Sequence, residues 1–279
     1  MVYFPVDIDK AIERECKRRG YSEKTIKSYL YCINRFLKYT RKTIDKISKR
    51  DVRLFLENLS EKNKTGNTMN LYHMAIRFLF EEVLDKRIWL NIKYSKVPRN
   101  PSITLTKEDI KRLINSIKNS KHKLMIQLMY GSGLRVSELT NLKIDDLDLE
   151  KGYGWVRNGK GNKDRLFIIP DSLKINLKEF ITSKKINEYD YLFTSLKGNK
   201  YSIRSPQQII KHAAKKAMIN KKVSCHTLRH SFATHLIEEG YSISEVQSLL
   251  GHKSPETTFI YIHSASPKMI KVKSPLDSL

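Results

Sequence analysis

Over residues 1–92, apolar side chains recur at the spacing of an amphipathic helix and are interrupted by residues typical of helix caps. The pattern predicts four helices, which run from Ile8 to Arg19, after Ser22, after Ser48 and after Asn67. Four amphipathic helices with short connections favour a compact bundle.

The fourth of these helices carries a polar stripe. Its expected inward side holds Leu71, Ala75, Phe78 and Leu79. At 100° per residue, Asn70, His73 and Arg77 fall within about 60° of one another on the other side. We expect this stripe to face a DNA groove, and a solvated polar face is the alternative.

The apolar pattern stops between Lys93 and Thr104, where KYSKVPRNPSIT contains two prolines. This composition predicts an interdomain linker over residues 93–103. Residues 104–279 then return to helical spacing, with two strands, Tyr153–Arg157 and Arg165–Ile169, on either side of a polar turn. Further helices are expected at 171–184, 206–218, 226–239, 244–250 and 254–262. The fold class predicted is mainly α, with an N-terminal four-helix bundle and a mostly helical second domain that has a small antiparallel sheet.

The charge balance points to a polyanionic partner. Lys and Arg total 53 against 29 Asp and Glu, which gives a formal charge of +24 spread along the whole chain. Enrichment in charge for thermal stability is the alternative, but it usually raises Glu together with Lys. Nucleic acid is therefore the expected partner.

Cysteine usage and hydropathy limit the other classes. Cys16, Cys32 and Cys225 have no paired spacing, so neither a disulfide framework nor a zinc-thiolate site is expected. No apolar run approaches the roughly 18 residues of a membrane span, and the first residues do not resemble a signal peptide. A cytoplasmic protein is expected.

Two short segments concentrate side chains that suit a phosphate. His226 and Arg229 are three residues apart in the first turn of a predicted helix, where the helix dipole also favours an anion. Further along, Tyr261 lies in the last turn of the helix expected after Ser254, and His252 precedes that helix.

Phosphodiester transfer explains why these residue types belong together. Its transition state gathers negative charge on the non-bridging oxygens, and the planar arginine fork donates two parallel bonds to such oxygens. A tyrosine phenol, with a reference pKa of about 10, needs a base or a cationic field before it attacks. Histidine can act as that base near neutral pH.

Two more cations occupy glycine-rich turns. Arg135 follows Gly131-Ser-Gly at the start of a predicted helix, and Lys160 lies between two glycines in the predicted hairpin turn. Taken singly, each of these residues has an ordinary explanation. A tyrosine on an amphipathic helix is usually core, and His226 with His230 has the i, i+4 spacing of metal ligands.

Their order along the chain resembles the motif boxes of the tyrosine recombinases, most closely the Xer branch and including its archaeal members. The resembling segments are GSGLRVSEL at 131–139, GKGNKDR at 159–165, HTLRHSFATH at 226–235, and LGH at 250–252 followed by Tyr261. The resemblance implies that Arg135, Arg229, His226 and His252 surround the scissile phosphate. It also implies that Lys160 protonates the leaving 5′ oxygen and that Tyr261 forms a 3′-phosphotyrosyl link.

The same resemblance assigns roles to further residues. Glu138 matches a common acidic position, which we interpret as an orienter of arginine, and Lys163 and Arg165 are expected DNA contacts. The family needs no metal and no nucleotide. It closes as a clamp on duplex DNA, with residues 1–92 as the core-binding domain and 104–279 as the catalytic domain, and four protomers join two sites through a four-way junction. Pro267 and Pro275 exclude the single long terminal helix of many relatives.

Three other functions compete with a site-specific recombinase. A type IB topoisomerase has similar catalytic groups, but it nicks and reseals one duplex. A DNA-binding regulator without chemistry explains the charge and leaves Tyr261 and Lys160 as coincidences. A metal nuclease could use His226, His230 and His235, although no acidic cluster completes such a site. The sequence leaves open whether recombination serves dimer resolution or integration of a mobile element.

Overall fold

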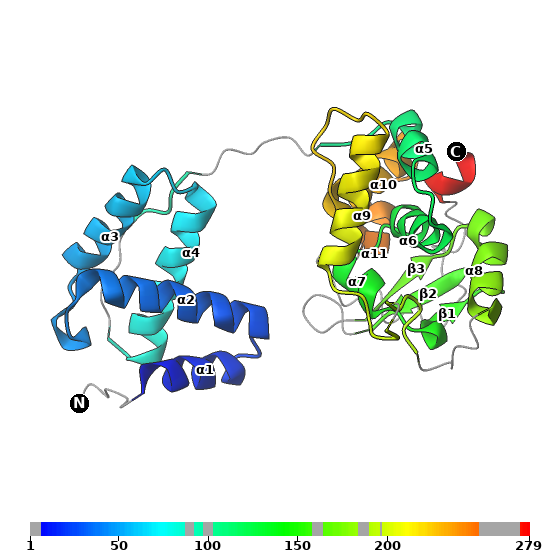
Figure 1. Cartoon of the computed structure of the whole chain (residues 1–279). Helices are drawn as coiled ribbons and strands as arrows, with labels where there is room; N and C mark the ends of the chain where they lie inside the picture. The colour runs from blue at the N-terminus through cyan, green and yellow to red at the C-terminus, as the bar shows by residue number, and fades with distance from the viewer. Residues whose placement is uncertain are drawn as a thin grey trace. The chain divides into compact units, whose positions relative to one another are not determined.

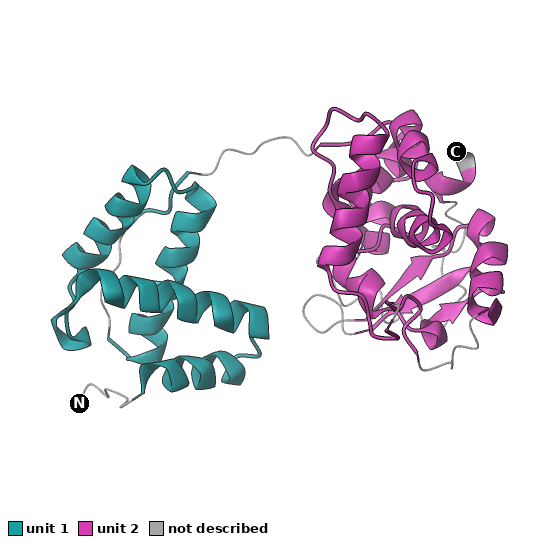
Figure 2. Ribbon diagram, in the orientation of Figure 1, with its two compact units in different colours: residues 1–100 teal, residues 101–279 magenta. Residues whose placement is uncertain are grey.

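The computed structural model describes residues 7–86, 92–96, 103–157, 164–183, 190–195, 197–250 and 274–279. It divides into two compact units, Met1–Asn100 and Pro101–Leu279, coloured separately in Figure 2. Each unit encloses a hydrophobic core of its own.

The first unit is a helical bundle (Figure 1). Its elements are α1 (Ile8–Arg18), α2 (Glu23–Thr40), the 3-10 turn η1 (Ile44–Lys46), α3 (Lys49–Glu61), α4 (Gly66–Arg77) and the π-helical segment η2 (Phe78–Val83). The caps explain where these helices begin. The Ser22 hydroxyl accepts a bond from the Thr25 amide at 3.2 Å, and Ser48 and Asp51 form a capping box. The predicted four-helix bundle is confirmed.

Aromatic side chains fill the core of this bundle. Phe36 of α2 and Phe55 of α3 lie 5.3 Å apart between ring centroids, and Phe55 lies 5.4 Å from Tyr72 of α4. Such edge-to-face pairs add to the free energy gained by burying the rings. The core therefore joins α2, α3 and α4 directly.

Helix α4 differs from the prediction in its start and in its buried face. It begins at Gly66, with the Thr65 hydroxyl as its cap, two residues earlier than expected. Tyr72 and Ile76 are buried, whereas Leu71, expected in the core, is 37% exposed. The buried face includes Tyr72 because α4 packs against α2 and α3, where the Tyr72 ring meets that of Phe55. Residues 92–96 also return across the helix.

This return covers part of the expected DNA-facing stripe. Asn70 accepts a bond from the Ser95 amide at 2.8 Å and donates one to the Ser95 carbonyl at 3.0 Å. His73 is only 2% exposed and stacks on Tyr94, with ring centroids 4.5 Å apart. The expectation of an open stripe is thus wrong for His73, and within the segment predicted as linker Tyr94 and Ser95 contact α4.

The second unit combines helices with one small sheet (Figure 1). Its elements are α5 (Lys107–Asn115), α6 (Ser120–Gly131), α7 (Val136–Asn141), η3 (Ile144–Asp146), β1 (Leu147–Asp148), β2 (Tyr153–Val156), β3 (Arg165–Ile168), α8 (Asp171–Ser183), α9 (Arg204–Lys216), α10 (Cys225–Glu238), α11 (Ile243–Leu250) and η5 (Pro275–Ser278). The strands are antiparallel in the order β1-β2-β3, and Gly154 pairs with Phe167. The predicted fold class is confirmed, with β1 as an addition.

Helix α6 lies at the centre of this unit and contacts α8, α9 and α10. Its side chains from Leu124 to Tyr130 are buried except for Gln127. The Tyr130 hydroxyl lies 2.8 Å from His235 Nδ1, and His235 Nε2 lies 2.9 Å from the Leu105 carbonyl. These two bonds fix the beginning of the second unit to α10.

The last residues of the chain pack onto the same unit. The Ser274 hydroxyl donates to the Gly131 carbonyl at 2.6 Å, and Leu276 is buried. The Asp277 carboxylate accepts the Ser172 amide at 2.9 Å at the beginning of α8, where a negative charge is favoured. Among the helices in the described ranges, none is both long and apolar enough to cross a membrane.

Candidate active site

Four charged side chains from separate elements meet inside the second unit. Arg135 caps the start of α7, Glu138 lies in the first turn of α7, Arg165 begins β3 and Arg229 lies on α10. All four have side chains that are less than one-fifth exposed.

The turn between α6 and α7 presents Arg135. Gly133 has φ +58°, and a Cβ there would lie 2.5 Å from Phe232 of α10, so glycine permits both the left-handed backbone and the close approach. Arg135 then takes an extended conformation, and its amide donates to Glu138 Oε2 at 2.8 Å. The segment therefore orders Arg135 through a bond to its own helix.

Glu138 is the common partner of the arginines. Its Oε1 accepts from Arg135 Nη1 and its Oε2 from Arg165 Nη2, both at 2.6 Å, and Arg229 Nη1 lies 3.7 Å from Oε2. Burial raises the pKa of this carboxyl, but the charges and bonds of Arg165 and Arg135 outweigh burial and hold the pKa below its ordinary value. The carboxylate is therefore ionised at neutral pH.

Arg229 is held by main-chain oxygens. Its guanidinium donates to the carbonyls of Gly133 and Leu250, and its side chain is 7% exposed. Burial, followed by the nearby charges of Arg165 and Arg135, lowers the pKa of Arg229, although a guanidinium remains protonated at neutral pH. Three arginines against one carboxylate leave an excess of positive charge that an anion would balance.

The histidines take separate positions. His226 lies in the first turn of α10 and His230 one turn later, and both side chains are exposed. His235 is buried, with both ring nitrogens bonded to Tyr130 and Leu105. In the described ranges, no three His, Cys, Asp or Glu side chains come together as a metal site would require.

Four of the predicted site residues lie outside the described residues. They are Lys160, Lys163, His252 and Tyr261. The chain leading to the last two leaves α11 at Leu250, whose carbonyl Arg229 holds.

Arg165 was predicted as a DNA contact, and the structure gives it different surroundings. Its side chain is 9% exposed, and it bonds to Glu138 and to the Leu249 carbonyl at 2.7 Å. The sequence carried one signal for this burial: an uninterrupted apolar run, Leu166-Phe167-Ile168, follows Arg165, and such a run is consistent with a strand buried on both faces.

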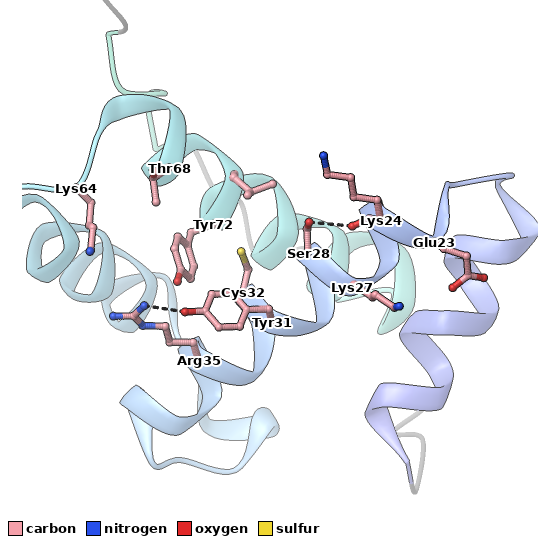
Figure 3. A pocket seen from close by; sticks show the side chains of 11 residues that line it. Glu23, Lys24, Lys27, Ser28, Tyr31, Cys32, Arg35, Lys64, Thr68 and Tyr72 are labelled. Atoms are coloured by element: carbon pink, nitrogen blue, oxygen red, sulfur yellow. Dashed lines mark hydrogen bonds between the residues drawn. The ribbon is translucent and has the colours of Figure 1, made fainter. Parts of the chain in front are cut away.

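The first unit has a surface feature that the sequence analysis missed. A groove with a volume of about 630 Å³ lies between α2 and α4 (Figure 3). Its lining includes four exposed cations, Lys24, Lys27, Arg35 and Lys64. Arg35 Nη1 donates to the Tyr31 hydroxyl at 3.1 Å, and Tyr31 is 61% exposed. We call this surface the α2–α4 groove.

Comparison with known proteins identifies the family of this chain. Residues 104–267 match the model of the phage integrase family, and residues 9–89 match that of the phage integrase N-terminal SAM-like domain. The chain belongs to the phage integrase family. It is therefore a tyrosine recombinase, an enzyme that acts on DNA.

Curated relatives are named as Xer recombinases. Tyrosine recombinase XerA of Thermococcus kodakarensis is 37% identical, over 92% of this chain and 90% of that protein. Tyrosine recombinase XerD of Oceanobacillus iheyensis is 33% identical, over 90% of this chain and 91% of that protein. The recognised family and its Xer branch are confirmed.

Solved structures show the same fold. A crystal structure of XerA recombinase matches with a TM-score of 0.52 and 30% identity, over 93% of this chain and 94% of that one. A XerH recombinase bound to its difH substrate matches with a TM-score of 0.70 and 24% identity, over 92% and 82%. The second of these likenesses concerns the fold alone.

Proposed function

We propose that this tyrosine recombinase cuts and rejoins duplex DNA at specific sites through a 3′-phosphotyrosyl link to Tyr261. The observation that carries the proposal is the arginine cluster around Glu138. It is a buried site with excess positive charge, arranged before any substrate binds, and such preorganised charge lowers the energy of a transition state that gathers negative charge.

In the proposed cleavage step, the Tyr261 phenol oxygen attacks the phosphorus and the bond from phosphorus to the 5′ oxygen breaks. Arg135 and Arg229 bind the non-bridging oxygens. His226 and His252 assist at the phosphate, and one of these two histidines accepts the phenol proton. Lys160 gives a proton to the departing 5′ oxygen. The new ester preserves the energy of the broken one, so rejoining needs neither a nucleotide nor a metal.

The two units divide the work in this proposal. Residues 1–92 form the core-binding domain, a linker spans 93–103, and residues 104–279 form the catalytic domain. The α2–α4 groove binds the phosphate backbone, because its cations are exposed and its volume admits a polyanion. Arg77 at the edge of α4 stays a predicted contact, and it pairs with Glu81 at 2.6 Å in the free protein.

For complete recombination, four protomers join two DNA sites and exchange strands in pairs through a four-way junction in the cytoplasm. Dimer resolution and integration of a mobile element both stay open, and this chain is similar both to relatives named Xer and to the 30% identical putative integrase/recombinase y4qK of Sinorhizobium fredii. Both roles use the same chemistry. They differ in whether the two sites lie on chromosome copies or on a mobile element.

Covalent trapping tests the proposal. Labelled DNA from the native locus, incubated with the protein and EDTA, should yield an adduct that survives denaturant. Tyr261→Phe should yield none while its DNA affinity stays within about 1 kcal/mol of the parent, because only the attacking oxygen is lost. Tyr241→Phe, in the same domain, is the matched control and should form the adduct normally.

The outcomes separate the competing functions. Strand cleavage that stops with EDTA, returns with a divalent ion and leaves no adduct would identify a metal nuclease. A protein that forms the adduct and relaxes supercoiled DNA, but never joins two sites, would be identified as a type IB topoisomerase. Tight binding without any adduct would identify a regulator.

A further inference from the structure

Arg165 connects three elements that are distant in the sequence. It begins β3, its Nη2 bonds to Glu138 Oε2 at the start of α7, and its Nη1 bonds to the Leu249 carbonyl near the end of α11. Nη1 also lies 3.2 Å from the Leu166 carbonyl. One guanidinium therefore ties together the strand, the helix start and the helix end that border the arginine cluster.

Burial and bonding exclude an open phosphate contact for Arg165. Its side chain is 9% exposed, compared with 19% for Arg135, and its terminal nitrogens already have protein acceptors. Its Nε is buried and has no bonding partner within the described ranges. A phosphate at the protein surface would meet Arg135 before Arg165.

The bonds of Glu138 show how Arg165 influences Arg135. Oε2 accepts both the Arg135 amide and Arg165 Nη2, while Oε1 accepts Arg135 Nη1. Without Arg165, one oxygen of a buried carboxylate would lose a charged partner, and the carboxylate would be free to rotate toward Arg229, 3.7 Å away. Rotation would carry the guanidinium of Arg135 with it.

We propose that Arg165 is a positioning residue, which sets the place of Arg135 through Glu138 and also fixes the end of α11 from which His252 follows. The proposal rests on the proposed function, because it assumes that Arg135 binds the scissile phosphate. Arginine is required because its planar fork reaches the carboxylate and the carbonyl at once, whereas a lysine ammonium is a single point charge.

The test compares two substrates at saturating DNA in single-turnover cleavage. One carries an ordinary scissile phosphodiester and the other a methylphosphonate, in which a methyl group replaces a charged oxygen. Arg165→Met should cleave the phosphodiester roughly 100-fold more slowly than the parent, because a misplaced arginine stabilises less of the developing charge. Its cleavage rate on the methylphosphonate should fall much less relative to the parent. Arg135→Ala sets the scale of this change in substrate preference.

Two further variants complete the experiment. Arg112→Met removes an arginine of the same domain that pairs with Asp109 at the surface, and the substrate preference should not change. Arg165→Lys keeps the charge and should shift the preference in the same direction but less. If Arg165→Met does not fold, the ratio of the cleavage rates of Arg165→Lys on the two substrates decides the test.

Four results would overturn the proposal. Equal losses on both substrates would show that Arg165 only stabilises the fold. Weaker binding, with a salt slope reduced by about 0.9 and an unchanged saturated rate, would show a DNA phosphate contact instead. If the parent protein forms no adduct, the proposed function is contradicted together with this inference. If the parent cleaves normally and both Arg165 variants keep the parent's preference between the two substrates, only this inference is contradicted.

Discussion

In the C-terminal unit three arginines surround one buried carboxylate, whereas in the N-terminal unit the cations of the α2–α4 groove are exposed. The first group is desolvated, and each member is held by carboxylate or carbonyl oxygens. The second group is in contact with water and counterions. Salt screens exposed charges strongly and buried ones much less.

The difference separates two uses of positive charge. Fixed charges in a dry site act on a transition state, because they need no rearrangement as charge develops. Exposed charges mainly gain affinity by releasing counterions from the DNA. We therefore expect changes at the cluster to alter rate and stability, and changes at the groove to alter affinity and its salt dependence.

The largest expected effect concerns Lys160, which lies outside the described residues. Lys160→Ala should cleave ordinary DNA about 100-fold to 10,000-fold more slowly, because the departing alkoxide lacks its proton donor. It should cleave DNA with sulfur at the bridging 5′ position at close to the parent's rate, since a thiol has a pKa of about 8.5 and leaves as the anion. Single-turnover cleavage of both substrates measures this.

Arg135→Ala and Arg229→Ala are the controls for that experiment. In the proposed mechanism these two arginines act on non-bridging oxygens, so both variants should gain much less from sulfur. If sulfur restores none of the activity of Lys160→Ala, the lysine positions the phosphate, and Lys163 becomes the candidate acid.

Glu138→Gln should show the next largest effect. It leaves the buried arginines without their counter-charge, which costs about 3–5 kcal/mol of the free energy of unfolding at neutral pH. Urea unfolding followed by circular dichroism measures this loss. Glu81→Gln breaks an exposed pair with Arg77 and should cost less than about 1 kcal/mol.

The pH dependence of this loss has a definite sign. The folded-state pKa of Glu138 lies below its ordinary value of about 4.3, so the stabilisation is complete above that value and disappears as the pH falls through the folded-state pKa. The difference between parent and variant should therefore shrink in acid. A difference that stays constant would place the loss in packing instead of charge.

The smallest effects are expected at the groove. Lys24→Ala and Lys27→Ala should each lower the slope of log affinity against log salt by about 0.9 and leave the cleavage rate at saturating DNA unchanged. Titrations by fluorescence anisotropy at several salt concentrations measure the slope. Lys38→Ala, on α2 but outside the groove lining, should leave it as in the parent. A lower cleavage rate at saturating DNA in the groove variants would contradict the division between a region that sets rate and a region that sets affinity.

Local signals in the sequence predicted much of the fold. The caps at Ser22 and Ser48 place two helix starts where the structure has them, because a cap depends on residues three positions apart. The turn before Arg135 was also predictable, because its glycines are neighbours in the sequence. Strand β1 was missed because two residues are too few for an alternating pattern.

Long-range packing accounts for what the sequence could not show. The burial of His73 on α4 depends on Tyr94, and Asn70 is bonded by Ser95; both residues return from beyond the helix. Likewise, the role of Arg165 depends on acceptors in α7 and α11, which helical or strand periodicity cannot place beside β3. The groove needs both α2 and α4, so neither helix alone predicts it.

The packing of the last residues has a consequence for Tyr261, the proposed nucleophile. Leu250 is held by Arg229, and Ser274 is held by Gly131, so the stretch of chain that carries Tyr261 is tethered at both ends within one unit. Contour length limits how far from two fixed points any residue between them can lie. If the Ser274 and Asp277 contacts opened, the second fixed point would be lost, and chain length would limit the position of Tyr261 from Leu250 alone.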